Sequence, residues 1–157
     1  MTLPPLRITL NSPEDTTKFA SRLGAILHPG DILLLQGKIG TGKTHFARSL
    51  IQSLMTRPED VPSPTFTLVQ VYDTRKGEIW HCDLYRLSAV EEVEELGLAE
   101  AMEQAICLIE WPEKLGPLTP GSALTMTFET DPDMLDMRHI TLTWTDEKWA
   151  QKLEVSE

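Results

Sequence analysis

Eight consecutive residues have the types and spacing that bind the phosphates of a nucleotide. The run Gly37-Lys38-Ile39-Gly40-Thr41-Gly42-Lys43-Thr44 matches the pattern G-x-x-x-x-G-K-S/T without a gap. Glycine permits positive φ angles, so successive backbone N–H groups can surround an anion. We expect Lys43 to reach the β- and γ-phosphates and the hydroxyl of Thr44 to bind Mg²⁺. A glycine-rich turn that binds no ligand is the alternative.

A phosphate loop needs a carboxylate that orients the metal ion, and two acids compete for that role. Glu110 follows four apolar residues, 106–109, which are typical of a buried strand. A carboxylate at such a strand end can hold Mg²⁺ directly or through water. Asp83 ends a weaker strand and could activate a water molecule or sense the γ-phosphate. The alternatives are a surface position for Glu110 and a capping role for Asp83.

Four further residues are weaker candidates for the same site. His45 begins the helix after the loop and would lend its backbone N–H to phosphate. Thr65 could contact the γ-phosphate or Mg²⁺, unless it only forms a turn. Trp111 follows Glu110 and is expected near the nucleotide, with ordinary packing as the alternative. Arg86 could neutralise phosphate charge, but an exposed or structural role is the alternative.

The elements around these residues predict an α/β fold. The apolar run 31–36 reads as a buried strand that leads into the phosphate loop, and a helix follows the loop. We expect a small P-loop NTPase with a central mixed, mostly parallel sheet, flanked by helices, with antiparallel strands at the C-terminal end. The other predicted elements are a strand at 6–10, a helix from Ser12 to about 27, a hairpin of 66–72 with 78–82, an acidic helix at 88–103, a strand at 105–109, and strands at 124–128 and 140–144.

Composition and charge limit the number of domains, the partners and the location of the protein. The chain has 157 residues, 41% of them hydrophobic, which is enough for one domain. We expect residues 1–145 to form it and residues 146–157 to be a polar tail, frayed or helical. The net charge of −10 disfavours direct tight binding of nucleic acid, which needs clustered Lys and Arg. Without a membrane-length apolar run or a signal peptide, we expect no membrane association and a cytoplasmic location.

The choice of nucleotide depends on motifs that are missing. GTPases recognise guanine with N-K-x-D and sense the γ-phosphate with D-x-x-G, and neither string occurs in the chain. ATP is therefore favoured over GTP. Nucleotide kinases carry a lid and a second-substrate domain, often rich in arginine, whereas the arginines of this chain are scattered. Cys82 and Cys107 form no C-x-x-C pair and are expected to be buried, reduced thiols.

The chain resembles the TsaE family, also called YjeE, which contains the small ATPase of bacterial threonylcarbamoyladenosine biosynthesis. The resemblance extends from about Leu10 to Trp144, and the D-L-Y-R and I-E-W-P-E strings are specific to the family. Two positions depart from the family pattern. Lys38 stands where the family usually has an acid, and His45 where it often has threonine. The matching motifs are the phosphate loop, Ser63-Pro64-Thr65-Phe66, His81-Cys82-Asp83-Leu84-Tyr85-Arg86 and Leu108-Ile109-Glu110-Trp111-Pro112-Glu113.

The resemblance implies a function and roles for individual residues. The protein would bind ATP with Mg²⁺, hydrolyse it slowly and dock on the TsaD–TsaB pair, which completes the modification of adenosine 37 in tRNAs that read ANN codons. Thr44 and Glu110 would hold Mg²⁺, and Asp83 would belong to the catalytic or switch machinery together with Lys43. A small-molecule or nucleotide kinase of the P-loop class, or a nucleotide-dependent assembly factor without hydrolysis, remains the alternative.

Overall fold

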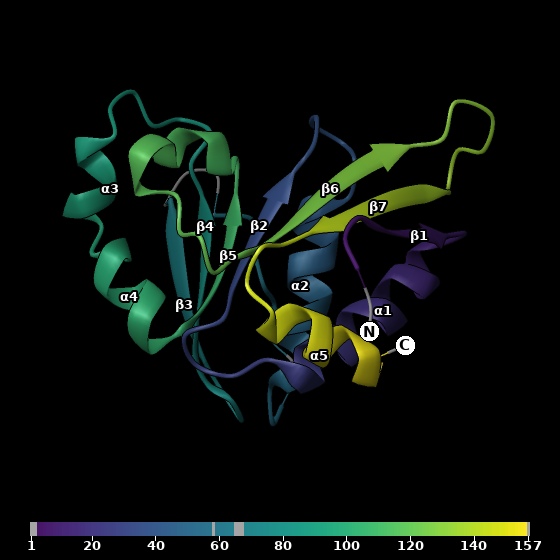
Figure 1. The fold of residues 1–157 in the computed structure, drawn as a ribbon, viewed down its shortest axis with the longest axis horizontal. Coiled ribbons are helices and arrows are strands. Elements are labelled where there is room, and N and C mark those ends of the chain that lie inside the picture. The colour runs from purple at the N-terminus through teal and green to yellow at the C-terminus, as the bar shows by residue number, and fades with distance from the viewer. Residues whose placement is uncertain (1–2, 58, 65–67, 157) are drawn as a thin grey trace.

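One mixed sheet of seven strands organises the described part of the chain, in the order β1-β7-β6-β2-β5-β4-β3 (Figure 1). The structure is a computed structural model and describes residues 3–57, 59–64 and 68–156. The predicted α/β fold with a mixed sheet is confirmed. The strands are β1 (Leu6–Leu10), β2 (Ile32–Gln36), β3 (Val69–Thr74), β4 (Gly77–Asp83), β5 (Ile106–Glu110), β6 (Leu124–Thr130) and β7 (Arg138–Thr143).

The parallel strands occupy the centre of the sheet and the antiparallel pairings lie toward its two edges. β2 pairs in parallel with β5 and β6, and β5 pairs in parallel with β4. The pairs β1–β7, β6–β7 and β3–β4 are antiparallel. Because β2, β5 and β4 run the same way, their carboxyl ends meet at one edge of the sheet, where ligands bind in open α/β folds.

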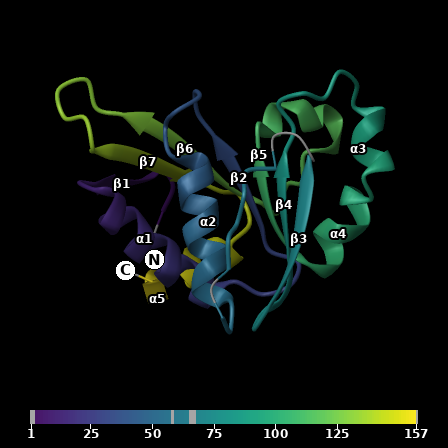
Figure 2. The ribbon, with the colours of Figure 1, turned by 180° about the vertical axis from the view of Figure 1, so that it is seen from behind.

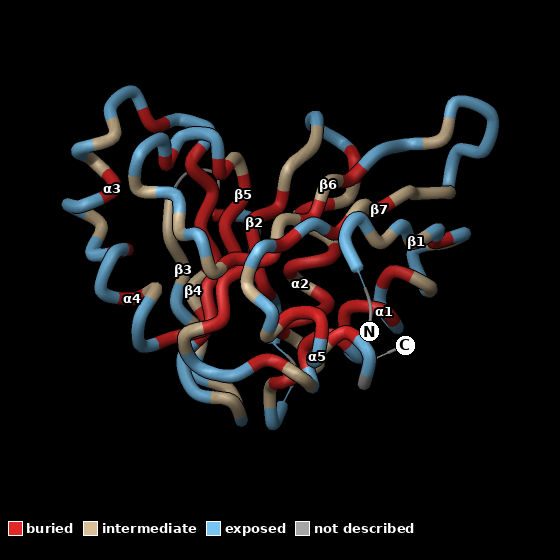
Figure 3. The backbone as a smooth tube through the Cα atoms, viewed as in Figure 1, coloured by how far each residue is buried: buried red, intermediate tan, exposed pale blue. Residues whose placement is uncertain are grey.

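Helices cover both faces of the sheet and enclose two apolar clusters. One face carries α1 (Pro13–Ile26), α2 (Lys43–Leu54) and α5 (Lys148–Ser156), and the other carries α3 (Glu91–Glu95), α4 (Leu98–Gln104) and the 3₁₀ helix η1 (Pro112–Leu118) (Figure 2). The side chains of β2 alternate between the clusters, with Leu33 and Leu35 in the first and Ile32 and Leu34 in the second. This explains its uninterrupted apolar sequence, and the burial is visible along the central strands in Figure 3.

Local sequence signals explain most of the element boundaries. Ser12 caps α1, because its hydroxyl accepts a hydrogen bond of 3.1 Å from the backbone N–H of Asp15, and Pro13 is the first helical residue. The predicted hairpin is confirmed as β3–β4, although its turn contains only Arg75 and Lys76. Its predicted start at Phe66 lies outside the described residues. The two C-terminal strands pair as expected.

The prediction of one helix over 88–103 is wrong. Two short helices, α3 and α4, replace it and are separated by Gly97, whose φ of +76° is left-handed. A residue with that φ cannot continue an α-helix, so the glycine ends one helix and lets the chain turn into the next. The apolar side chains of Val93 and Leu98 are buried from the two separate helices.

The segment after residue 145 contributes to the core as well as to the surface. Trp149 and Leu153 of α5 are buried against the rest of the first cluster. Asp31, just before β2, ties this helix down: its carboxylate oxygens lie 2.9 Å from Nζ of Lys148 and 2.9 Å from Nζ of Lys152. It also accepts a 2.8 Å hydrogen bond from the backbone N–H of His28.

Cys82 and Cys107 are buried and free, as expected, and burial raises the pKa of the Cys107 thiol to about 12. No helix within the described residues is both long and apolar enough to cross a bilayer.

Candidate nucleotide-binding site

The phosphate loop connects the end of β2 to the start of α2, and its geometry requires glycine. Gly37 has a φ of +143°, and a Cβ there would lie 2.6 Å from the carbonyl oxygen of Phe128 and 2.8 Å from Oγ1 of Thr41. Gly42 caps α2 with a φ of +101°. The hydroxyl of Thr41 donates a 2.8 Å hydrogen bond to the carbonyl oxygen of Lys38. The loop is thus built as a turn whose N–H groups precede a helix N-terminus, an arrangement that suits phosphate.

Lys43 lies inside the site, with its side chain folded back over the loop. Its Nζ donates a 2.5 Å hydrogen bond to the carbonyl oxygen of Gly37 and lies 3.7 Å from the centre of the Trp111 ring. Burial lowers the pKa of the ammonium group, and the charges of Glu110, Glu113 and Asp83 raise it by less. The lysine is therefore a partly desolvated cation, which interacts more strongly with an anionic ligand than a lysine in water does.

Glu110, at the end of β5, contacts the first turn of α2. Its carboxylate oxygens accept the hydroxyl of Thr44 at 2.9 and 3.2 Å. Its Oε2 also lies 2.7 Å from Nε2 of His81, a fully buried residue of β4. Glu110 itself is only 2% exposed, so it is not the surface acid of the alternative interpretation. Three adjacent elements therefore meet at this carboxylate.

Asp83 is next to Glu110 at the same sheet edge. The two residues are register partners at the ends of β4 and β5, and Asp83 is 5% exposed. Its Oδ1 accepts a 3.0 Å hydrogen bond from the backbone N–H of Tyr85. The ring of Tyr85 lies 4.9 Å from that of Trp111, centre to centre. Trp111 has a left-handed φ of +57°, an uncommon conformation for a non-glycine residue that is often found at functional sites.

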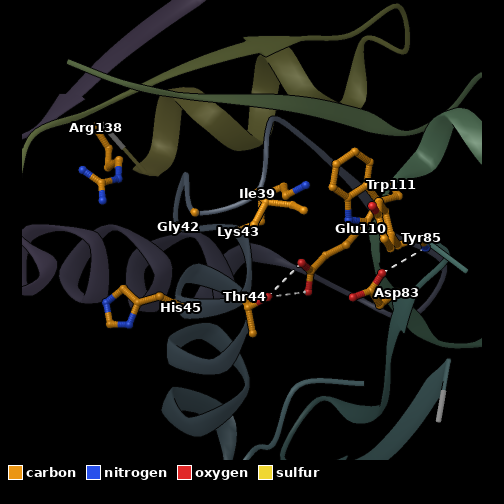
Figure 4. Close-up of a pocket in the computed structure, with 11 residues that line it drawn as sticks. Ile39, Gly42, Lys43, Thr44, His45, Asp83, Tyr85, Glu110, Trp111 and Arg138 are labelled. Atoms are coloured by element: carbon orange, nitrogen blue, oxygen red, sulfur yellow. Dashed lines mark hydrogen bonds between the residues drawn. The ribbon is translucent and has the colours of Figure 1, made fainter. Parts of the chain in front are cut away.

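These residues surround a cavity of about 460 Å³, within the size range of small-molecule sites. Figure 4 shows Lys43, Glu110, Asp83 and Trp111 on one side of it and Arg138 and His45 on the other. The lining residues are Ile39, Gly40, Gly42, Lys43, Thr44, His45, Asp83, Tyr85, Glu110, Trp111 and Arg138. Arg138, at the start of β7, was not among the candidates from the sequence, and neither was Tyr85 as a separate residue.

The remaining candidates lie in different places. Arg86 is exposed and is not among the described residues that line the cavity. Lys38 is exposed on the loop. The ring of His45 points to α1, where its Nε2 lies 3.3 Å from the carbonyl oxygen of Pro13. Thr65 lies outside the described residues.

The spacing of Thr44 and Glu110 fits a magnesium ion. Neighbouring ligands of octahedral Mg²⁺, with bonds of about 2.0–2.1 Å, are about 2.9 Å apart. Oγ1 of Thr44 and Oε1 of Glu110 are 2.9 Å apart, so they could occupy adjacent positions around the ion. Among the described residues, no group of three or more His, Cys, Asp or Glu side chains is arranged to hold a metal. Most ligands would therefore have to come from phosphate and water.

Comparisons with known proteins agree with the motifs. A family model described as "Threonylcarbamoyl adenosine biosynthesis protein TsaE" matches residues 10–140. The chain belongs to the TsaE family. The expected resemblance is thereby confirmed, and the match spans every described residue placed around the cavity above.

Individual relatives support the membership. The tRNA threonylcarbamoyladenosine biosynthesis protein TsaE of Rickettsia bellii is 44% identical over 84% of this chain and 92% of its own length. The TsaE protein of Bacillus subtilis is 37% identical over 84% of this chain and 81% of its own. Among solved structures, that of Bacillus subtilis YdiB superposes with a TM-score of 0.76, at 26% identity, over 99% of this chain and 96% of the other.

Proposed function

We propose that this TsaE-family chain binds ATP with Mg²⁺ in the 460 Å³ cavity and hydrolyses it slowly. The hydrolysis would support a TsaD–TsaB-type complex that modifies adenosine 37 of tRNA. The observation that carries the proposal is the contact of Glu110 with the Thr44 hydroxyl at the start of α2. That contact joins a phosphate loop to a strand-end carboxylate, the two parts that metal-assisted phosphate chemistry needs. The role in tRNA modification follows the names of the relatives.

Binding in this proposal begins with the phosphates. The backbone N–H groups of residues 37–45 would surround them, with the positive end of the α2 dipole behind. Lys43 would leave the carbonyl oxygen of Gly37 and move its charge to the β- and γ-phosphates. The ring of Trp111 would then border the same charged region, because it already lies 3.7 Å from Nζ of Lys43.

Thr44 and Glu110 would hold the metal ion. When bound, Mg²⁺ would neutralise negative charge on the phosphate oxygens. The Thr44 hydroxyl would still donate its hydrogen bond to Glu110, and a lone pair of its oxygen would bind the cation. Glu110 would act directly or through a water molecule.

Asp83 is the residue proposed to act on the attacking water. In hydrolysis a water oxygen forms a bond to the γ-phosphorus, the bond to the β–γ bridging oxygen breaks, and ADP, phosphate and a proton leave. Asp83 is buried next to Glu110 at the same end of the sheet, and its Oδ1 is fixed by the backbone N–H of Tyr85. A carboxylate so placed can orient the water and accept its proton.

Coupling to a partner would run through the segment that follows α2. Arg48 of α2 donates a 2.9 Å hydrogen bond to the carbonyl oxygen of Val61, and Gln52 donates one of 2.9 Å to that of Glu59. The loop residues 59–61 are thus attached to the helix that begins with Lys43 and Thr44. A change at the phosphates would reach this loop through α2, and through it a neighbouring protein.

The test is phosphate release by the purified chain, alone and with the TsaD–TsaB pair. We expect slow release that rises when the pair is added, and tighter ATP binding in the complex, because linkage requires the same factor in both directions. Equal affinity and equal turnover in the two conditions would rule out the coupling. Label transfer from ATP to a metabolite would favour a kinase, and ATP binding without phosphate release would favour an assembly factor.

A further inference from the structure

His81 is a buried polar residue in a position where an apolar one would pack. It lies on β4 opposite Leu108 of β5, and its neighbours on the same sheet face, Ile79 and Ile106, belong to the apolar cluster beneath α2. Its exposed fraction is 0%. Within the described residues its Nδ1 has no hydrogen-bond partner. An imidazole buried with one ring nitrogen unpaired costs stability, so a structural role alone explains it poorly.

Among the described residues, the hydrogen bond of His81 is made with Glu110. Nε2 lies 2.7 Å from Oε2 of the carboxylate, short for a hydrogen bond between nitrogen and oxygen. Since a carboxylate accepts, Nε2 carries the hydrogen and donates it. The Thr44 hydroxyl is closer to Oε1, at 2.9 Å, than to Oε2, at 3.2 Å. Each oxygen of Glu110 is therefore fixed mainly by a different element.

We propose that His81 is a positioning residue that holds Oε2 of Glu110 so that Oε1 faces the cation-binding hydroxyl of Thr44. The proposal rests on the magnesium role given to Glu110 above. Without the contact, the carboxylate of Glu110 could rotate about the last bond of its side chain, and Oε1 would no longer be held toward the ion. Outer contacts of this kind around metal-binding carboxylates and imidazoles change metal affinity by about 10–100-fold when they are removed.

The experiment measures binding of Mn²⁺ as a substitute for Mg²⁺. Mn²⁺ is titrated into the full chain saturated with ADP and followed by electron paramagnetic resonance, and ADP affinity is measured separately in EDTA. His81→Leu removes the donor. His81→Gln keeps an N–H donor the same number of bonds from the backbone as Nε2, and His81→Asn carries its donor one bond too short.

We expect His81→Leu and His81→Asn to weaken Mn²⁺ binding about tenfold or more, while the metal-free affinity for ADP stays within about twofold. His81→Gln should recover most of the lost Mn²⁺ affinity. Equal Mn²⁺ affinity in the Gln and Asn variants would overturn the proposal, and this pair decides it even if His81→Leu does not fold. Glu110→Gln separates the two claims. If it binds Mn²⁺ like the wild type, the magnesium role of Glu110 fails; if it alone weakens binding, only the role of His81 fails.

Discussion

Two buried carboxylates at opposite ends of the central strands have very different contacts. Asp31, just before β2, is 4% exposed and contacts two lysine ammonium groups and a backbone N–H. Glu110, at the end of β5, is 2% exposed and contacts a hydroxyl and an imidazole. In the described part of the chain, no lysine or arginine forms an ion pair with Glu110.

The difference agrees with a structural role for Asp31 and with the metal-binding role proposed for Glu110. Asp31 meets more positive charge than it carries, and the result is a fixed contact between β2 and α5. Glu110 and its register partner Asp83 place two carboxylates side by side, and the nearby Lys43 is bonded to the carbonyl oxygen of Gly37. Two neighbouring carboxylates of this kind suit the cation proposed above, which would also balance the charge of the phosphates.

The largest effect is expected from removing the lysine of the phosphate loop. Lys43→Ala should lower ATP affinity about 100-fold or more, because hydrogen bonds to charged groups contribute about 1.5–3 kcal/mol each. Isothermal titration with ATP and Mg²⁺ measures it, and circular dichroism checks the fold. Lys152→Ala is the matched control: it should destabilise the protein and leave ATP affinity unchanged. Loss of affinity in both variants, or in neither, would erase the distinction between the two ends of the sheet.

The two neighbouring acids should differ in what they support. Glu110→Gln is expected to raise the Mg²⁺ concentration needed for hydrolysis and to slow it about 100-fold, since removing one stabilising group of an active site typically costs this much. Asp83→Asn should slow hydrolysis without changing the Mg²⁺ requirement. The measurement is phosphate release across a Mg²⁺ titration. The reverse pattern would mean that the roles of the two acids are exchanged.

Neutralising each carboxylate should change the free energy of unfolding by different amounts. Asp31→Asn removes one partner of two ion pairs and should lower the free energy of unfolding by about 2 kcal/mol. Glu110→Gln removes a buried charge that no lysine or arginine of the described residues pairs with, and Thr44 and His81 can still bond the amide, so stability should stay within about 1 kcal/mol of wild type or rise. Urea unfolding at pH 7 compares them. A larger loss in Glu110→Gln would contradict the comparison.

The smallest effect is expected on the stability of the protein at low pH. Burial raises the pKa of Asp31, but the hydrogen bonds from Lys152, Lys148 and the His28 backbone lower it by more, so it lies below its ordinary value. A carboxyl group whose pKa is lower in the folded state stabilises the fold at pH values above its unfolded pKa of about 3.9. This stabilisation is lost as the pH falls from there toward the folded pKa. The stability difference between wild type and Asp31→Asn should therefore shrink between about pH 5 and 3. A constant difference would exclude ionisation as its source.

The sequence predicted best what local chemistry determines. The phosphate loop, the strand before it and the helix after it depend on neighbouring residues, since Gly37 and Gly42 must take positive φ and β2 is apolar on both faces. Glu110 was predicted because a strand end followed by an acid is itself a local pattern. The break at Gly97 was missed because the acidic run on either side of it suits a helix equally well.

Contacts between distant segments could not be predicted from local patterns. His81 of β4 contacts Glu110 of the neighbouring strand β5, and no residue near His81 in the sequence indicates this partner. Arg138 reaches the cavity only because β7 lies beside β6, which lies beside β2. Trp149 is buried within a segment of mixed polarity, where lysine, glutamine and glutamate stand among the apolar residues and weaken the helical signal.

The pairing of β1 with β7 also determines when the protein can fold. Leu6 is opposite Leu142, and β2 is enclosed by β5 and β6, strands that come much later in the chain. Contacts of such long sequence separation form slowly, because closing the intervening loops costs entropy. During synthesis, β2 can therefore pair with both of its neighbouring strands only after the ribosome has made the chain up to residue 130. A chain halted earlier would present the unpaired apolar edge of β2 to other chains, so translational arrest within residues 37–123 should favour aggregation over a partly folded, nucleotide-binding domain.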